Sequence, residues 1–220
     1  MQPEAVLFDL DGTLLDTAPD FILVLNSLLI EHGLCPLPEK QIRNTVSNGA
    51  RALVTLGFGL IEGEGDFEIY RNKLLTAYQN QLGQASCLFP GMNDLLKKLE
   101  TNGIPWGIVT NKPSRFTIPL LKALSLDTRC QVLVCADEVT YPKPHPESLL
   151  KACEILKVSP ENSIYIGDHQ RDIEAGHSAN MTTIAALFGY IPDHENPMSW
   201  KAHFTANAAK DIHGHIFTGY

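Results

Sequence analysis

The chain of 220 residues contains no apolar run long enough to cross a lipid bilayer. Its first residues, Met1 to Glu4, also lack the basic and apolar segments of a secretory signal peptide. We therefore expect a protein of the cytoplasm that has no membrane partner.

Basic side chains are too few and too scattered for binding to nucleic acid. The chain has 17 Lys and Arg against 25 Asp and Glu, a formal net charge of −8, and no basic run interrupts this balance. Proteins that bind nucleic acid carry clustered positive charge, so we expect no nucleic-acid partner.

The cysteines show neither the pattern of a disulfide framework nor that of a zinc site. They are odd in number, and no spacing pairs two of them as ligands of one metal ion. We expect reduced thiols that pack as small apolar groups. The five residues are Cys35, Cys87, Cys130, Cys135 and Cys153.

Short apolar segments alternate with segments of helical periodicity along much of the chain. This alternation predicts an α/β fold with a doubly wound, Rossmann-like parallel sheet. Each expected strand is short and apolar, as strands buried on both faces should be. The strands are expected at Ala5 to Phe8, Trp106 to Val109, Gln131 to Cys135, Ser163 to Ile166, Thr182 to Ala186 and His203 to Thr205.

The first two expected strands are separated by far more residues than one crossover helix needs, which indicates an inserted module. Apolar residues in the insert recur at helical spacing. We expect a helical cap domain over residues 16–84 and an α/β core domain over 1–15 and 85–220. The cap helices are expected at Phe21 to His32, Glu39 to Val46, Ala50 to Phe58 and Phe67 to Leu82.

Two carboxylates follow the first expected strand, in Asp9-Leu10-Asp11-Gly12-Thr13. Residues two apart leave a strand on the same side, so Asp9 and Asp11 can face one ligand at the carboxyl edge of the sheet. Like charges this close need a proton or a cation between them, and oxygen donors favour Mg²⁺. Taken alone, the fragment is equally compatible with a solvated acidic turn.

Three later motifs follow expected strands or lie in the loops beyond them. Thr110 and Asn111 offer phosphate-binding groups, although this stretch is also typical of an ordinary helix N-terminus. Lys143 lies between two prolines that restrict where its ammonium points. Asp168 follows the apolar strand that ends near Ile166, and it places a third carboxylate where a metal would lie.

The four motifs follow one another in a fixed order, and the inserted helices come directly after the first. With this arrangement the whole chain resembles the haloacid dehalogenase-like hydrolase superfamily. It looks most like phosphatases of the phosphoglycolate phosphatase type. The resemblance implies an enzyme that hydrolyses a small phosphate monoester with Mg²⁺ as cofactor.

The resemblance also implies roles for individual residues. Asp9 would attack phosphorus and form an aspartyl-phosphate, while Asp11 would protonate the leaving alcohol and then activate water. The side chains of Asp9 and Asp168 and the backbone carbonyl of Asp11 would hold Mg²⁺.

Further groups would bind the transferred phosphoryl. Thr110 and Lys143 would contact its oxygens with Asn111 nearby, and Asp172 would support Lys143 or the metal shell. The sequence departs from the family pattern at His169, where a small or acidic residue is common, so the surroundings of the metal are expected to differ.

Two alternatives share these motifs. A phosphomutase of the β-phosphoglucomutase type uses the same core, and a non-catalytic phosphate-binding protein would keep the same fold. Asp11 would not be required for binding alone, so its presence favours an enzyme. It also favours phosphate chemistry over attack on carbon.

The cap is expected to select the substrate. Asn48 and Gly49 predict a turn before a helix, and Arg51 in its first turn is a candidate contact for a substrate carboxylate. A solvated helix residue is the equally weighted alternative for Arg51.

Several segments are similar to one bacterial branch, the N-acetylmuramic acid 6-phosphate phosphatases of cell-wall recycling. We expect that sugar phosphate as the preferred substrate, or else 2-phosphoglycolate, since both carry a carboxylate. The chain itself is expected to be a monomer or a homodimer. The similar segments are Asp16 to Phe21, Asn48 to Arg51, Thr110 to Phe116, Gly189 to Ile191 and Trp200.

Overall fold

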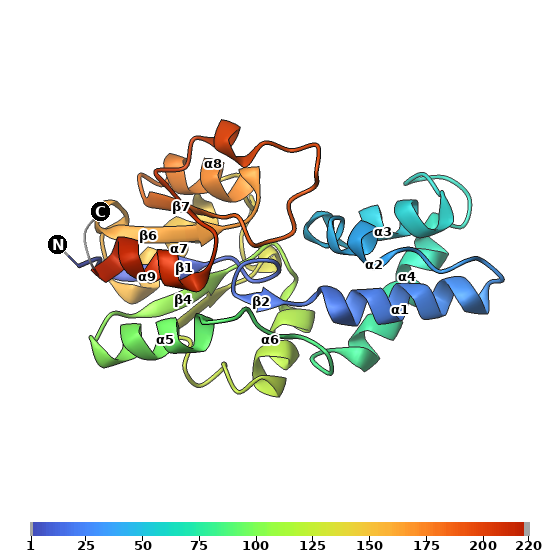
Figure 1. Ribbon diagram of the computed structural model, residues 1–220, viewed down its shortest axis with the longest axis horizontal. Helices are drawn as coiled ribbons and strands as arrows, with labels where there is room; N and C mark the ends of the chain where they lie inside the picture. Colours follow the sequence, from blue (N-terminus) through green and yellow to red (C-terminus); the bar gives the residue numbers. More distant parts are fainter. Residues whose placement is uncertain (1, 218–220) are drawn as a thin grey trace.

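A computed structural model describes residues 2–217 and joins six strands in one sheet of order β5-β4-β1-β6-β7-β8 (Figure 1). Every hydrogen-bonded pair in this sheet is parallel. The predicted doubly wound α/β fold is therefore confirmed. The strands are β1 (Ala5–Phe8), β4 (Trp106–Val109), β5 (Val132–Val134), β6 (Ser163–Gly167), β7 (Thr182–Ala186) and β8 (Phe204–Ala206).

Helices cover both faces of this sheet because successive strand residues point to opposite sides. On one face, Phe8 and Trp106 pack in a cluster with α5 and α9, which lie side by side in Figure 1. On the other face, Leu7 and Tyr165 pack with α7 and α8. The core helices are α5 (Met92–Thr101), α6 (Ser114–Ala123), α7 (Glu147–Leu156), α8 (Gln170–Ser178) and α9 (Ala209–Phe217).

Four helices inserted between β1 and β4 form a separate lobe, in which α1 packs against α2, α3 and α4. We call this lobe the cap. A Cβ atom on Gly57 of α3 would lie 2.9 Å from Leu25 of α1, so the small residue allows these helices to approach. The cap helices are α1 (Ala18–Glu31), α2 (Glu39–Arg43), α3 (Gly49–Phe58) and α4 (Phe67–Gln81), with a 3₁₀ turn, η1 (Val46–Asn48), before α3.

The cap joins the core through a two-stranded antiparallel ribbon, β2 (Leu15–Asp16) with β3 (Cys87–Leu88), which the sequence pattern did not predict. Two residues are too few to show a strand pattern. The buried carboxylate of Asp20 fixes the returning chain, because it accepts hydrogen bonds from the amides of Gly83 and Ala85 and from the Ser86 hydroxyl.

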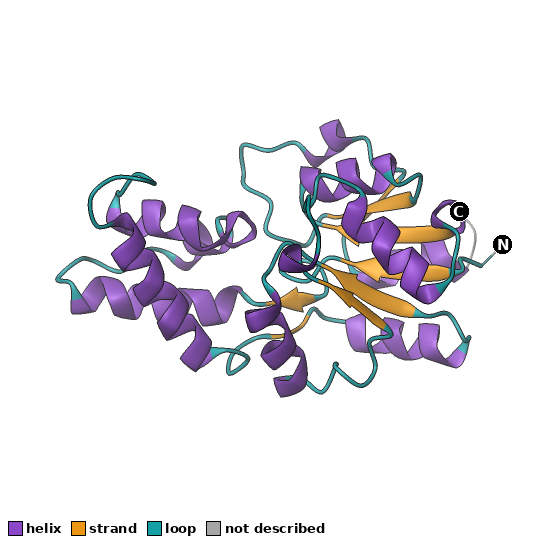
Figure 2. Cartoon of the chain, turned by 180° about the vertical axis from the view of Figure 1, so that it is seen from behind, coloured by secondary structure: helices purple, strands orange, loops and turns teal. Residues whose placement is uncertain are grey.

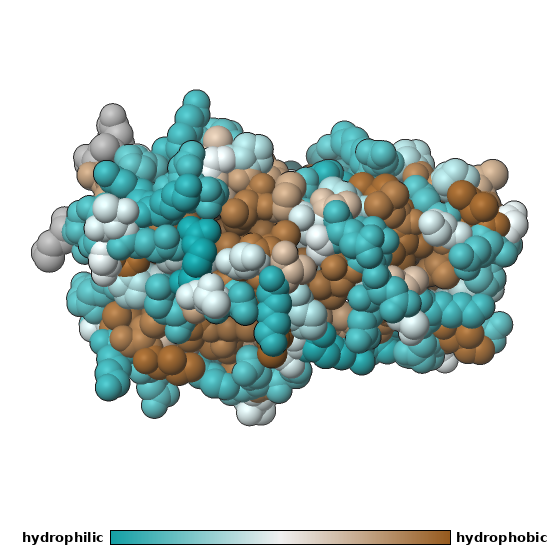
Figure 3. Space-filling model, turned by 90° about the horizontal axis from the view of Figure 1, so that it is seen from below, coloured by the Kyte–Doolittle hydropathy of each residue, from teal (hydrophilic) through white to brown (hydrophobic). Residues whose placement is uncertain are grey.

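The molecule is elongated, with the sheet in one lobe and only helices and loops in the other (Figure 2). Seen from below, hydrophobic side chains show among hydrophilic ones on both lobes (Figure 3). Among the helices between residues 2 and 217, none combines the length and the apolar character that crossing a membrane requires.

Candidate active site

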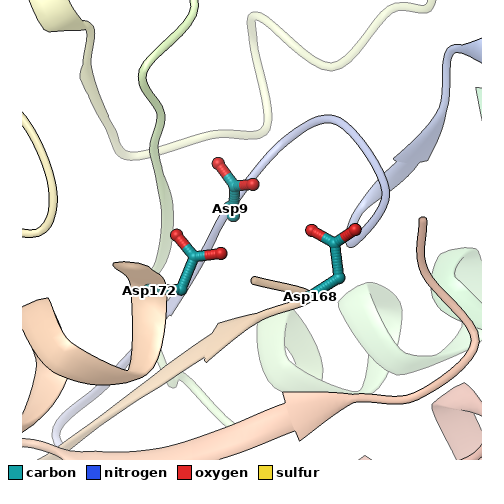
Figure 4. A group of neighbouring side chains, drawn as sticks. All are labelled: Asp9, Asp168 and Asp172. Carbon is teal, nitrogen blue, oxygen red and sulfur yellow. The ribbon is translucent and has the colours of Figure 1, made fainter. Parts of the chain in front are cut away.

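Three aspartates meet at the carboxyl ends of β1 and β6. Asp9 follows β1, Asp168 follows β6, and Asp172 lies in the first turn of α8; Figure 4 shows their side chains rising on the same side. One oxygen from each carboxylate lies within 4.8 Å of the others. Asp9 and Asp168, two of the predicted strand-end carboxylates, thus lie together in the structure, and the third member of the group is Asp172 and not the side chain of Asp11.

Two glycines make room for Asp168. Gly12 has a positive φ of 86°, and a Cβ atom there would lie 2.1 Å from Asp168 Oδ2. A Cβ atom on Gly189 would lie 2.2 Å from Asp168 Cβ. The Gly12 turn after β1 and the loop after β7 can thus close around the same carboxylate.

Asp168 is almost fully buried, and three neutral groups donate hydrogen bonds to it. Its Oδ1 accepts from the Thr13 hydroxyl at 3.2 Å, and its Oδ2 accepts from the Tyr190 amide at 2.8 Å and from the Ser47 hydroxyl at 3.2 Å. Ser47 belongs to the cap, so the cap reaches this carboxylate directly. Burial, together with the charge of Asp9, raises the pKa of Asp168 well above its ordinary value.

Lys143 extends into the core between Asp9 and Asp172. Its Nζ lies 2.7 Å from an oxygen of each carboxylate and donates hydrogen bonds to the Tyr165 hydroxyl at 2.7 Å and the Val109 carbonyl at 3.0 Å. Burial alone would lower the pKa of Lys143, but the two carboxylates outweigh it and raise the pKa. The ammonium is therefore a fixed buried cation beside Asp9.

Asn111 holds the loop that carries Lys143. Its side-chain amide donates to the Lys143 carbonyl at 2.8 Å, and its side-chain oxygen accepts from the Lys143 amide at 3.1 Å. Asn111 also lines the central cavity. The structure therefore gives Asn111 a part in placing the lysine, which the sequence pattern did not indicate.

Asp9 and Asp172 both line the cavity, and Asp9 is the more exposed of the two. Its side chain is 13% exposed, against 1% for Asp172. Burial raises the pKa of Asp9 from 3.8 to about 6, with Lys143 opposing the rise and the charge of Asp172 adding to it. Near neutral pH, above this pKa, the group is thus mainly a carboxylate.

Asp11 lies at the rim of the same cavity, where it is held from two sides. Lys112 Nζ lies 2.9 Å from its Oδ1 and 3.2 Å from its Oδ2, and the Thr17 hydroxyl also donates to Oδ1. Thr110 is buried beside them, and its hydroxyl accepts from the Lys112 amide at 3.1 Å.

The cavity lies between core and cap and has a volume of about 300 Å³. The core contributes Asp9, Asp11 and Lys143, while the cap contributes an apolar wall that includes Phe21 and Tyr78. Four arginines from both lobes also line it, and two of them, Arg51 and Arg71, are paired with glutamates of the cap. The four are Arg51, Arg71, Arg115 and Arg171.

The two predicted cap contacts line this cavity but already have partners. Arg51 forms an ion pair with Glu62, and its side chain is 50% exposed. The Asn48 side chain accepts a hydrogen bond from Arg171 at 2.9 Å. Arg171 also donates to the Ser47 carbonyl at 3.0 Å, so this core arginine ties η1 of the cap to α8.

His169 serves as the N-cap of α8. Its Nδ1 accepts a hydrogen bond from the Arg171 amide at 3.2 Å, and its ring stacks near Trp200 with centroids 6.4 Å apart. Its amide donates to Asp172 at 3.1 Å. His169 is the residue at which the sequence departs from the family pattern. In the structure it caps the N-terminus of α8, the helix that carries Asp172.

Several site residues carried no recognisable signal in the sequence. Lys112 stands beside Thr110 in the motif, yet nothing in the pattern shows that it reaches Asp11. In the sequence, Tyr165 is indistinguishable from an ordinary strand residue. Ser47 and Arg171 meet only because the cap folds back on the core. Their roles depend on contacts between residues far apart in the chain.

The fold and the site define a class of protein, an α/β core whose strand-end carboxylates lie under an inserted helical cap. Residues 6–186 match the haloacid dehalogenase-like hydrolase family. The chain belongs to this family, and the predicted membership is confirmed.

Named relatives match nearly the whole chain. An N-acetylmuramic acid 6-phosphate phosphatase of Pseudomonas aeruginosa is 43% identical over 96% of this chain and 94% of its own. A phosphoglycolate phosphatase of Xanthomonas campestris pv. campestris is 41% identical, over 91% and 90%. The crystal structure of a predicted phosphoglycolate phosphatase from Haemophilus somnus 129PT superposes with a TM-score of 0.86 at 26% identity, covering 98% of both chains.

Proposed function

We propose that the protein is a Mg²⁺-dependent phosphomonoesterase that acts through an aspartyl-phosphate on Asp9. The observation that carries the proposal is the position of Asp9, which opens to the cavity while Lys143 and two further carboxylates surround it. Phosphoryl transfer requires an aligned nucleophile and neutralised charge, and this site supplies both.

The carboxylates fit a hard divalent cation. Asp9, Asp168 and Asp172 bring three oxygen ligands together, but Lys143 is the one ammonium that pairs with them among the described residues. Burial first, and the charges of neighbouring carboxylates second, raise the pKa values of Asp9 and Asp168. In line with the family resemblance, we assign Mg²⁺ to the side chains of Asp9 and Asp168, with the backbone carbonyl of Asp11, and we leave the more deeply buried Asp172 to hold Lys143. The cation would supply neutralisation of phosphoryl charge.

The chain's own residues account for the remaining steps. The Asp9 carboxylate attacks phosphorus, while Lys143 and the hydroxyl of Thr110 offer donors to the phosphoryl oxygens. Asp11 delivers a proton to the departing alkoxide and then takes one from the water that cleaves the aspartyl-phosphate. The cap keeps bulk water from the cavity between these events.

We propose a substrate with a carboxylate as well as a phosphate, with N-acetylmuramic acid 6-phosphate preferred and 2-phosphoglycolate second. The names of the relatives at 43% and 41% identity support both substrates. The arginines of the cavity support a second anionic group. Arg51 would have to leave its ion pair with Glu62 to bind the substrate carboxylate. Arg115 has no ion pair within 4.0 Å among the described residues. Both arginines are therefore tested.

The test is release of inorganic phosphate with Mg²⁺ from these two esters and from a hexose phosphate that lacks a carboxylate. We expect turnover by the wild type, loss in Asp9→Asn, and full activity in the exposed control Asp127→Asn. A wild type that is inactive on every ester contradicts the proposal, and conversion of the hexose phosphate to an isomer without phosphate release identifies a mutase.

Arg51→Ala and Arg115→Ala, assayed separately, test the substrate class. We expect at least one variant to lose its preference for esters that carry a carboxylate through a higher KM. If both retain the wild-type preference, the assignment of the carboxylate to these arginines is wrong.

A further inference from the structure

Lys112 is a buried lysine at the boundary between core and cap. Its side chain is 6% exposed, and its Nζ lies 2.9 Å from Asp11 Oδ1 and 2.8 Å from the hydroxyl of Tyr78. Asp11 belongs to the loop after β1, whereas Tyr78 lies in α4 of the cap. One ammonium therefore bridges the two lobes at the rim of the cavity.

Two aromatic rings of the cap complete the surroundings of this ammonium. Phe21 of α1 and Tyr78 of α4 stack with centroids 3.9 Å apart and planes 7° from parallel. Lys112 Nζ lies 5.2 Å and 4.7 Å from their centroids, within the range of cation–π attraction. These rings compensate part of the hydration that a buried ammonium loses.

The same contacts determine how Asp11 is held. Its carboxyl group receives the Lys112 ammonium on one side and the Thr17 hydroxyl, just before α1, on the other. Lys112 is itself oriented by Tyr78 and Phe21. If the cap swings away, the lysine loses its cap partners and keeps Asp11 as its charged partner.

We propose that Lys112 is a positioning residue for Asp11, and that Tyr78 makes this positioning depend on the docked cap. The inference rests on the proposed role of Asp11 as acid and base, and it deepens that role. Asp11 is correctly oriented when the cap covers the cavity, so proton transfer is coupled to the exclusion of water. Neither Lys112 nor Tyr78 needs to touch the phosphate for this effect.

The decisive experiment is a double-mutant cycle between Lys112→Met and Asp11→Asn, measured on the ester that the wild type hydrolyses best. We expect Lys112→Met to lower kcat by about 10- to 100-fold in the wild-type background, with KM changed less than about 3-fold. In the Asp11→Asn background, the same substitution should change kcat by less than about 3-fold, because its only route to the reaction is gone.

A second pair of variants tests the link to the cap without removing a charge. Tyr78→Phe keeps the stacked ring and deletes the hydroxyl that orients Lys112, and we expect kcat to fall about 5- to 10-fold. Tyr70→Phe is the matched control, since Tyr70 also lies in α4 but packs against Phe58 and His32. It should retain the wild-type kcat.

The outcomes separate this inference from the proposed function. If Lys112→Met lowers kcat equally with and without Asp11, or if Tyr78→Phe and Tyr70→Phe behave alike, the positioning role is wrong while the phosphatase assignment stands. Tyr78→Phe decides the case if Lys112→Met fails to fold. A wild type inactive on every ester overturns the proposed function and this inference with it.

Discussion

Replacing Asp9 by asparagine should change how the stability of the metal-free protein depends on pH. Burial raises the pKa of Asp9 from 3.8 to about 6, so the folded protein binds this proton more tightly than the unfolded chain does. The stabilisation from that proton is complete below the unfolded pKa and is lost as the pH rises through the folded pKa. Asparagine has nearly the same shape but binds no proton in this range.

The magnitude follows from the two pKa values. The full shift of about two pKa units corresponds to about 3 kcal/mol, of which roughly 1 to 1.5 kcal/mol is lost between pH 5 and pH 7.5. The wild type should lose that much stability over this interval relative to Asp9→Asn. Lys143 keeps its ion pair with Asp172 in the variant, so no unpaired buried charge is created.

The assay is urea unfolding with a chelator present, at pH 5 and at pH 7.5, for wild type and Asp9→Asn. Both proteins contain the same histidines, so the difference between them reports Asp9 together with its effect on the neighbouring Asp168, whose pKa the charge of Asp9 helps to raise. Parallel pH dependence in the two proteins would refute the conclusion that this carboxylate is destabilised by burial. Added Mg²⁺ should stabilise the wild type at pH 7.5 by more than it stabilises the variant.

Three further outcomes are expected. Asp168→Asn should raise the metal-free melting temperature, because a crowded buried charge is removed, and it should abolish stabilisation by Mg²⁺ in thermal melts. Asp11→Asn should lower kcat/KM for an alkyl phosphate by about 10² to 10⁴, but much less for p-nitrophenyl phosphate, whose leaving group needs no proton; equal losses would exclude the acid role. Gly12→Ala should abolish Mg²⁺ stabilisation and activity, since its Cβ would lie 2.1 Å from Asp168 Oδ2, whereas Gly103→Ala, also at positive φ but with nothing within 4 Å, should retain both.

The sheet could be predicted because each parallel strand is buried on both faces and therefore reads as a short apolar run. The run from Ala5 to Phe8 forms β1 as expected. The expected strand from His203 to Thr205 is shifted by one residue in the structure, where β8 spans Phe204–Ala206. The ribbon of β2 and β3 is held by the meeting of two distant segments, which leaves no local pattern.

The candidate site could be predicted where a residue's position along the chain fixes its position in the fold. Asp9 and Asp168 follow β1 and β6, which are neighbours in the sheet, so their side chains meet. The ammonium of Lys143 also reaches Asp9, and it points into the core. A loop and not a strand end sets this direction. The contact of Lys112 with Tyr78 depends on how the cap docks, and the pairing of Arg51 with Glu62 depends on the fold of the cap itself. Local sequence encodes neither.

The most direct test of the proposed aspartyl-phosphate mechanism is a search for phosphate on Asp9 during turnover. Wild type and Asp9→Asn are mixed with the best ester and Mg²⁺, quenched in acid within milliseconds, and examined by peptide mass spectrometry. We expect one phosphoryl group on the wild-type peptide that contains Asp9, removable by hydroxylamine, and none on the variant. Turnover without that adduct, or Asp9→Asn working at the wild-type rate, would contradict this mechanism.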